Sequence, residues 1–192
     1  MSPQLVAVIV VAVVVVGADM GVRAWASRHV QELFARGDFA GIVTFTHGLA
    51  GRVAFDPFTQ RYLRLNAYLL ADNTDEALAA IDDLLALGLK PAQREAVVRK
   101  ALRLYVEKGR KVRARQLAET EAGTRMGDWC REVYEVCFEG SSEYREQMEQ
   151  QLAGASGDEA SELAFYLYLQ CKNAGDAQGA RKYRAMVEKA AA

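Results

Sequence analysis

The feature that most constrains this chain is a turn-forming sequence that returns about every 35 residues along its length. The turns centre on Gly37, Asp72, Gly109, Gly140 and Gly175, at steps of 35, 37, 31 and 35 residues. A stretch with helical spacing of apolar residues precedes and follows each turn. A period of this length predicts helix–turn–helix units that stack, because one pair of helices alone has too little apolar surface to form a core.

The composition also favours helices. Ala, Leu, Glu, Arg and Lys dominate after residue 20, and the 192-residue chain contains only three Pro. Hydrophobic residues make up 51% and charged residues 26%, which is typical of a globular rather than a disordered chain. The length suits one domain, or a small domain with an anchor.

Helical spacing predicts which side chains pack within two of the units. In the unit around Asp72 we expect one helix to pack against the next through Leu65, Tyr68 and Leu69 on one side and Leu78, Ile81, Leu84 and Leu85 on the other. In the unit around Gly175 the corresponding sets are Ala164, Leu167, Tyr168 and Cys171 on one side and Ala180, Tyr183 and Val187 on the other.

These repeats resemble tetratricopeptide repeats. Asn66-Ala67-Tyr68 followed by Asp75-Glu76-Ala77 is similar to the core of that motif, as are Gly37-Asp38-Phe39 and the run from Gly175 to Tyr183. Further positions that match are Trp129 as the early aromatic, Tyr68 and Tyr105 as the later tyrosine, Ala77, Ala114 and Ala180 as the small crossing residue, and Pro91 after a repeat. The resemblance implies an all-α, TPR-like superhelix of about five helix–turn–helix units over residues 24–192.

The chain departs from the family at two kinds of position. Where the family prefers Gly, this sequence has Leu65, Leu102, Val133 and Tyr168. At the small crossing position the first unit has Ile42 and the fourth has Arg145, so the fourth unit is the most degenerate. Close approach between helices must therefore be achieved by other residues.

The N-terminal segment is strongly apolar. Leu5 to Ala18 contains no polar side chain, and Asp19 is the only charge before Arg23. A helix from Pro3 to Val22 would rise about 30 Å, which matches the hydrocarbon thickness of a bilayer. We therefore expect residues 1–23 to be a transmembrane anchor that precedes the repeat domain. The residues that would form this anchor include Leu5, Val8, Ile9, Val13 and Val16.

Two other interpretations of this segment stay open. Val16 and Ala18 suit the cleavage site of a signal peptide. Signal peptides usually carry a Lys or Arg before the apolar run, however, and this sequence has none there. The segment could also be a buried apolar element of a soluble domain. Arg23, Arg28 and Arg36 follow the segment. If the segment spans the membrane, the positive-inside rule therefore places the repeat domain in the cytoplasm. The alternative location is secreted or periplasmic.

Residues that could carry chemistry are scarce. The chain has only His29 and His47, with no nucleophile signature around either, and no glycine-rich phosphate loop. Cys130 and Cys137 lie seven residues apart on one expected helix, too far for a disulfide, so a bridge would need Cys171 and would leave one thiol free. We therefore expect no enzymatic activity, metal, cofactor or small-molecule substrate, and a reducing compartment.

The family resemblance implies a concave groove lined by the first helix of each unit. The residues that it places there are Ser27, Gln31, Tyr62, Asn66, Leu69, Arg99, Arg103, Val106, Cys130, Tyr134, Cys137, Phe165, Leu169 and Lys172. Asn66 with Arg99 and Arg103 would form a cationic pocket for a carboxylate, similar to the clamp by which some members hold acidic C-terminal tails. Tyr134, Phe165 and Leu169 would form an apolar end of the groove.

Charge is distributed unevenly along the chain. Lys90 to Arg115 holds ten basic and two acidic residues, whereas Glu119 to Glu162 holds three basic and twelve acidic residues. The two stretches predict complementary charges on neighbouring units, and the basic stretch could alternatively meet anionic lipids. The overall net charge of −1, and a basic run without interleaved aromatic residues, argue against nucleic-acid binding.

The sequence thus indicates a membrane-anchored scaffold or adaptor that binds a segment of a protein partner, such as an acidic or C-terminal segment. Two alternatives remain. One is an extracytoplasmic repeat protein of envelope assembly, and the other is an accessory subunit of a membrane enzyme or translocase complex.

Overall fold

The computed structural model describes the backbone of residues 3–190 and the side chains of residues 20–189. The described residues form eleven α-helices and one π-helical turn, and they contain no strand. The chain is therefore all-α, as its composition predicts. Contacts divide it into two compact units, Met1–Val97 and Val98–Ala192, with the boundary inside one helix.

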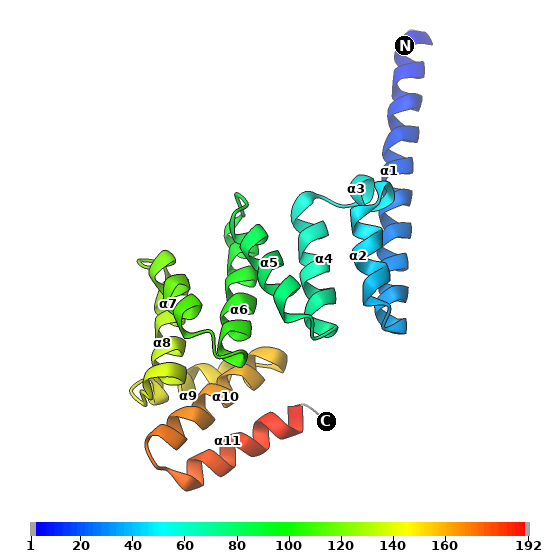
Figure 1. Cartoon of the computed structure of the whole chain (residues 1–192). Coiled ribbons are helices and arrows are strands. Elements are labelled where there is room, and N and C mark those ends of the chain that lie inside the picture. Colours follow the sequence, from blue (N-terminus) through cyan, green and yellow to red (C-terminus); the bar gives the residue numbers. More distant parts are fainter. Residues whose placement is uncertain (1–2, 191–192) are drawn as a thin grey trace. The chain divides into compact units, whose positions relative to one another are not determined.

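The first unit contains five complete helices and the beginning of a sixth (Figure 1). They are α1 (Pro3–Arg36), α2 (Phe39–His47), α3 (Leu49–Ala54), α4 (Pro57–Leu70), α5 (Thr74–Leu85) and α6 (Pro91–Glu107). Within this unit α2 packs against α1 and α4, and α4 packs against α5. The short helix α3 contacts α1 and α2 and was not expected from the sequence.

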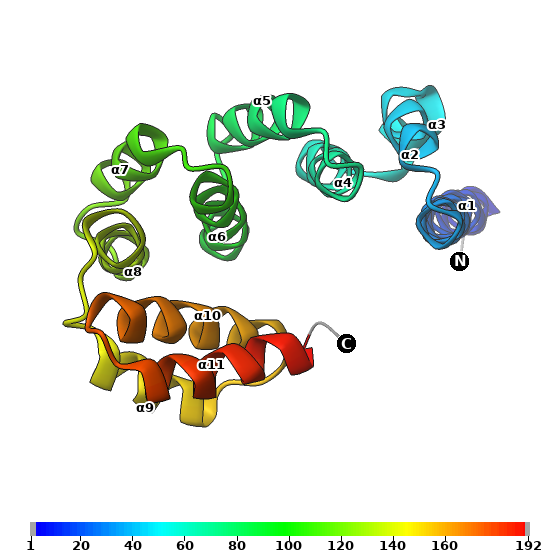
Figure 2. The same ribbon diagram turned by 60° about the horizontal axis from the view of Figure 1, so that its bottom comes forward.

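The second unit contains the remainder of α6 and the C-terminal helices. They are α7 (Lys111–Thr120), α8 (Arg125–Tyr134), the π-helical turn η1 (Glu135–Glu139), α9 (Arg145–Gly154), α10 (Gly157–Asn173) and α11 (Ala177–Ala190). Here α7 packs against α8, and α10 lies side by side with both α9 and α11 (Figure 2).

Four of the five predicted turns share one backbone conformation. Gly37, Asp72, Gly109 and Gly175 have φ values of 69°, 51°, 63° and 72°, in the left-handed region that Gly and Asp tolerate best. In each turn the N–H of the next residue donates to a carbonyl five residues earlier, at 2.7 to 2.9 Å, and the next helix begins one residue later. These junctions connect α1 to α2, α4 to α5, α6 to α7 and α10 to α11. The helix–turn–helix prediction is confirmed at these four positions.

The first and last of these turns also share a helix cap. The Asp38 side chain accepts the N–H of Gly41 at 2.8 Å, and the Asp176 side chain accepts the N–H of Gly179 at 2.9 Å. A Cβ at either glycine would collide with the capping carboxylate, and at Gly179 it would also lie 2.7 Å from Cys171 Sγ on α10. The spacing Gly-Asp-x-x-Gly therefore serves the turn and its helix cap, and at Gly179 it also permits the close approach of α11 to α10.

The fifth turn is different. Gly140 also has positive φ, 75°, but it follows the π-helical turn η1, and the Ser141 N–H donates to Glu135 O at 3.0 Å. The Asn173 amide donates to the carbonyls of Val136 and Ser141 at 3.0 and 2.9 Å, which ties this turn to the end of α10. The fourth unit is thus irregular, in agreement with its degenerate sequence.

The core follows the predicted helical faces. In the first unit Leu65, Ala77, Ile81 and Leu84 are fully buried between α4 and α5. In the second unit Ala164, Leu167 and Cys171 on α10 and Tyr183 on α11 are buried. At the small crossing position Ala77, Ala114 and the larger Ile42 are fully buried, whereas Ala180 is half-buried.

Closest approach between helices depends on glycines that the repeat pattern did not predict. A Cβ at Gly127 on α8 would collide with Glu121 O and lie 2.6 Å from Glu121 C, at the end of α7. A Cβ at Gly51 on α3 would lie 2.8 Å from Thr46 Cα on α2. Both distances are too short for a real Cβ, so only Gly fits at these contacts.

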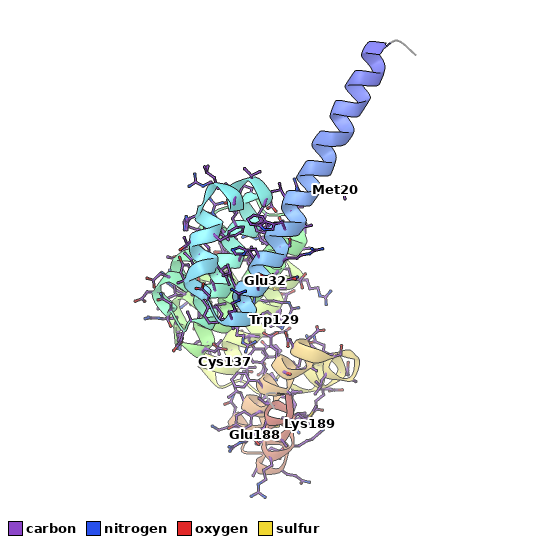
Figure 3. All side chains as sticks on the ribbon, turned by 90° about the vertical axis from the view of Figure 1, so that its right-hand side faces the viewer. Met20, Glu32, Trp129, Cys137, Glu188 and Lys189 are labelled. Atoms are coloured by element: carbon purple, nitrogen blue, oxygen red, sulfur yellow. The ribbon has the colours of Figure 1, made fainter. Side chains whose placement is uncertain are left out.

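The predicted membrane anchor lies outside the described side chains, which begin at Met20 on α1 (Figure 3). This applies to Leu5, Val8, Ile9, Val13 and Val16, although the backbone of α1 is helical from Pro3 onwards. Among the helices searched in the described residues, none combines the length and apolar character needed to cross a membrane.

Candidate partner-binding site

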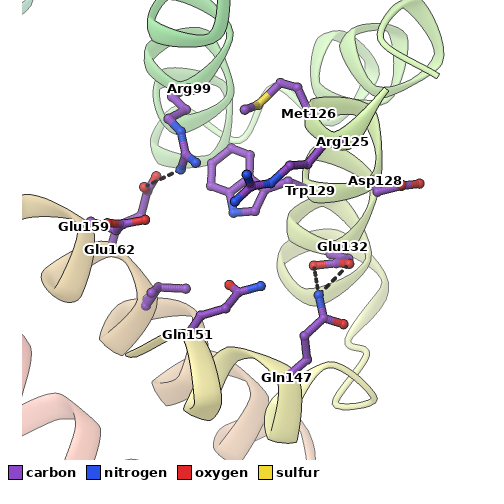
Figure 4. Close-up of a pocket in the computed structure, with 11 residues that line it drawn as sticks. Arg99, Arg125, Met126, Asp128, Trp129, Glu132, Gln147, Gln151, Glu159 and Glu162 are labelled. Carbon is purple, nitrogen blue, oxygen red and sulfur yellow. Dashed lines mark hydrogen bonds and ion pairs between the residues drawn. The ribbon is translucent and has the colours of Figure 1, made fainter. Parts of the chain in front are cut away.

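A hollow of about 270 Å³ opens in the second unit beside Trp129 (Figure 4). Arg99 on α6, Arg125 and Trp129 on α8, Gln151 on α9 and Glu159 on α10 contribute to its wall. Four segments separated in sequence thus meet around one aromatic ring. Figure 4 shows the Arg125, Trp129 and Gln151 side chains directed into the hollow, while Asp128 points away from it.

Arg99 connects the aromatic and acidic parts of the wall. Its guanidinium carbon lies 4.6 Å from the centroid of the Trp129 ring, and its Nη1 lies 3.6 Å from Glu162 Oε2. The Tyr166 hydroxyl donates to Glu162 Oε1 at 3.3 Å, and the Tyr166 ring meets Trp129 edge-on at 6.1 Å. Burial raises the pKa of the Glu162 carboxyl, and the charge of Arg99 opposes that rise.

Glu132 is a second buried carboxylate of the hollow. Its exposed fraction is only 8%, and the Gln147 amide donates to its two oxygens at 3.1 and 3.3 Å. Burial raises the pKa of Glu132, while the hydrogen bond from Gln147 lowers it. Within residues 20–189, neither Glu132 nor Glu159 has an ion-pair partner.

The hollow is acidic in sum. Apart from Asp128, which points away and pairs with Arg131, its lining contains the carboxylates of Glu132, Glu159 and Glu162 and the guanidinium groups of Arg99 and Arg125, an excess of one acidic group. Because Arg99 is already paired with Glu162, the remaining charge favours a cation as the visiting group.

A second hollow, of about 340 Å³, shares Glu162 with the first. Arg103, Val106 and Phe165, all predicted as groove residues, line it together with Tyr166. Arg103 Nε lies 2.9 Å from Glu107 Oε1, one helical turn further along α6. Glu107 raises the pKa of Arg103, in agreement with this ion pair. The structure therefore brings Arg103 and Phe165 together, and it gives both predicted arginines a carboxylate partner from the chain itself.

Tyr134 and Leu169 lie elsewhere in this unit. Tyr134 lines a third hollow with Arg115 and Glu119, and its hydroxyl donates to Glu139 at 2.8 Å. Lys111 Nζ lies 2.9 Å from the same carboxylate and 6.0 Å from the Tyr134 ring. Leu169 is half-buried and does not line any of the three hollows. Tyr134, Phe165 and Leu169, which were predicted to form the apolar end of the groove, thus do not line a common hollow.

Tyr62 and Asn66 belong to the first unit, where both are half-buried on α4. The Tyr62 ring stacks on Phe58 at 5.3 Å, and burial raises the pKa of Tyr62. The grouping of Asn66 with Arg99 and Arg103 joins residues of separate units and stays a prediction.

The charge pattern of the sequence has a direct counterpart in the second unit. Arg99 pairs with Glu162, and Lys111 pairs with Glu139, so residues of the basic stretch contact residues of the acidic stretch. The complementarity predicted from the sequence is confirmed at these two pairs.

Residues suited to catalysis are dispersed. The His29 ring stacks on Trp25 and meets Phe45 edge-on, and His47 lies 3.4 Å from Arg64 Nη1. The three cysteines are free thiols. In the part of the chain whose side chains are described, no group of three or more His, Cys, Asp or Glu residues is arranged to hold a metal ion.

Sequence reasoning placed Trp129 as a structural aromatic and did not predict that it would form the wall of a hollow. Glu132 and Glu162 were missed because carboxylates on amphipathic helices are usually solvated. The signal for Glu132 is its place three residues after Trp129, which puts both side chains on one helical face.

Comparisons of the chain with protein-family models, with curated proteins and with solved structures give no significant match.

Proposed function

We propose that this chain is a membrane-anchored helical-repeat scaffold of the tetratricopeptide type, which binds a segment of another protein and catalyses no reaction. The four equivalent turns, each joining the two helices of one pair, support the repeat. The observation that carries the binding proposal is the acidic hollow beside Trp129, whose wall is assembled from α6, α8, α9 and α10.

The partner segment in this proposal presents a Lys or Arg side chain. Its apolar stem would enter the hollow beside Trp129, and its charged group would approach Glu132 and Glu159. An acidic segment, as first expected from the two arginines, would instead have to displace Glu162 from Arg99 or Glu107 from Arg103. The charge balance therefore favours a basic partner segment over an acidic one.

The proposal includes membrane attachment through Leu5 to Ala18, with the repeat domain in the cytoplasm, as the arginines after this segment suggest. A reporter fused to the C-terminus tests this location. Activity of a cytoplasmic reporter agrees with the proposal, and activity restricted to a periplasmic or extracellular reporter contradicts it.

The binding proposal is tested by selecting short random peptides on the full chain in detergent micelles. We expect enrichment of peptides with a Lys or Arg beside an apolar residue. Gln151→Lys adds a positive charge inside the hollow and should lower the affinity for these peptides by roughly tenfold or more. Gln150→Lys is the matched control, because Gln150 is exposed on the same helix and does not line the hollow.

Two outcomes would contradict this partner chemistry. In one, both lysine variants bind the selected peptides as tightly as the parent chain does, which would mean that the peptides do not bind in the hollow. In the other, acidic peptides are enriched and Arg103→Glu abolishes their capture, which favours the carboxylate clamp instead.

A further inference from the structure

The helix α3 buries small residues and exposes large apolar ones, whereas a normal surface helix buries its large apolar side chains. Gly51 and Ala54 are buried, whereas Leu49 and Val53 expose 80% and 68% of their surface. Leu49 and Val53 are four residues apart and so lie on one face of the helix. Burying small residues while exposing large apolar ones is unfavourable in water, so this face calls for an apolar environment.

The orientation of α3 is fixed by its contacts. Gly51 approaches the end of α2 too closely for any other residue, which holds the opposite face outward. On either side of α3, Phe45 and Phe55 meet edge-on at 6.5 Å, and Phe45 also meets Trp25 of α1 at 5.8 Å. The exposed face is therefore a built feature of the first unit, held against α1.

The same part of α1 exposes large apolar side chains as well. Met20 and Trp25 have exposed fractions of 67% and 54%, and Val22 is also exposed. Five of the eight large apolar side chains that are exposed among the described residues belong to α1 or α3. Figure 1 shows α3 beside the middle of α1. Figure 3 shows Met20 close to the point where α1 extends beyond the other helices of this unit.

We infer that the exposed face of α3, with Leu49 and Val53, and the exposed side chains Met20, Val22 and Trp25 of α1 lie in the interfacial layer of a lipid bilayer. The inference rests on the membrane attachment proposed above. Its support is continuity, because α1 is helical without interruption from Pro3 to Arg36 and the face follows the apolar run Leu5 to Ala18 directly. A Trp at this depth and exposed arginines at positions 23 and 52 suit the headgroup region.

The consequence is that α3 fixes the first unit against the membrane surface. A single transmembrane helix alone would leave the attached domain free to tilt. A second contact through Leu49 and Val53 would hold it at one depth and orientation.

Tryptophan quenching by brominated lipids tests the inference. The full chain is reconstituted in phosphatidylcholine–phosphatidylglycerol vesicles as Trp25→Phe/Val53→Trp and, for the control, Trp25→Phe/Val112→Trp. Val112 is an equally exposed apolar residue of the second unit, at 69%, and the buried Trp129 gives the same background in both variants. We expect brominated lipids to cause a loss of emission at position 53 and no loss above background at position 112.

The outcomes separate this inference from membrane attachment itself. If Trp25 of the parent chain is quenched but position 53 is not, the chain is anchored and α3 does not touch lipid, which overturns the inference. Emission at position 53 that changes with protein concentration and not with brominated lipid assigns the face to a second copy, with the same consequence. If neither Trp25 nor position 53 is quenched, the membrane attachment fails too.

Discussion

Arg99 and Trp129 form the central contact of the second unit, with the guanidinium carbon 4.6 Å from the centroid of the indole ring. The same guanidinium group lies 3.6 Å from Glu162, so one side chain from α6 joins α8 to α10. Because Arg99 and Glu162 are largely shielded, with side-chain exposed fractions of 31% and 17%, solvent screens this contact less than it screens a surface ion pair.

We expect Arg99→Ala to lower the free energy of unfolding by about 1 to 2 kcal/mol, since it removes both the cation–π contact and the partner of a buried carboxylate. Arg99→Lys should recover only part of this loss, because an ammonium group cannot stack flat on the ring. Chemical denaturation followed by Trp fluorescence provides the measurement.

Arg131→Ala is the matched control for Arg99→Ala. Arg131 pairs with Asp128 at 3.1 Å, but these side chains are 59% and 62% exposed, so the cost should stay below about 0.5 kcal/mol. Equal losses in the two alanine variants would show that the Arg99 contact is no stronger than a surface pair.

Gly127→Ala tests the close approach of α7 and α8. The added methyl group would collide with the Glu121 carbonyl, and relief requires the two helices to separate, at a cost of about 2 to 3 kcal/mol. Gly154→Ala is the control in the same unit, because a Cβ there meets nothing within 4 Å and helix propensity slightly favours Ala. A Gly127→Ala variant that melts at the parent temperature would contradict the tight contact.

The turns could be predicted from the sequence because their cause is local. A left-handed residue is needed where each helix reverses, and Gly37, Gly109 and Gly175 supply it with no Cβ to strain. Asp72 supplies the same conformation with a side chain that tolerates it. The turn at Gly140 was predicted at the right place, but the π-helical turn before it has no sequence signal that we can identify.

The site was harder to predict because it depends on contacts between distant residues. The family spacing puts Cys130 and Tyr134 on the groove face of α8, but neither lines the hollow beside Trp129, whereas Trp129 and Glu132 of the same helix do. The side of α8 that faces the hollow is therefore not the side that the family spacing indicates. Arg99, Arg103 and Phe165 do line hollows of the second unit, so the faces of α6 and α10 were anticipated.

The cysteines should react slowly in the folded chain. Burial raises the pKa of the Cys130 and Cys137 thiols to about 12, so less thiolate is present at pH 8 than in an exposed cysteine, by a factor of about a thousand. We expect iodoacetamide to label both residues promptly in denaturant and only after long incubation without it. Mass spectrometry of digested samples reports each site, and prompt labelling of Cys130 in native buffer would contradict its burial.

The buried Glu132 carboxyl should make stability depend on pH in a direction opposite to that of a salt-bridged acid. Burial raises its folded-state pKa above the usual value of 4.5, so the folded chain holds its proton more tightly than the unfolded chain does. The contribution to stability is then fully present below pH 4.5 and is lost as pH rises through the folded-state pKa.

Glu132→Gln removes this dependence and keeps an acceptor for the Gln147 amide. We expect the variant to be more stable than the parent chain at pH 7, with a difference that shrinks as pH falls toward 4.5. Urea titrations at several pH values measure the difference, and Glu146→Gln, exposed on α9, serves as the surface control. A Glu132→Gln variant that is less stable at neutral pH would mean that the ionised carboxylate is held by a favourable charge, and the acidic hollow would then offer little to a basic partner.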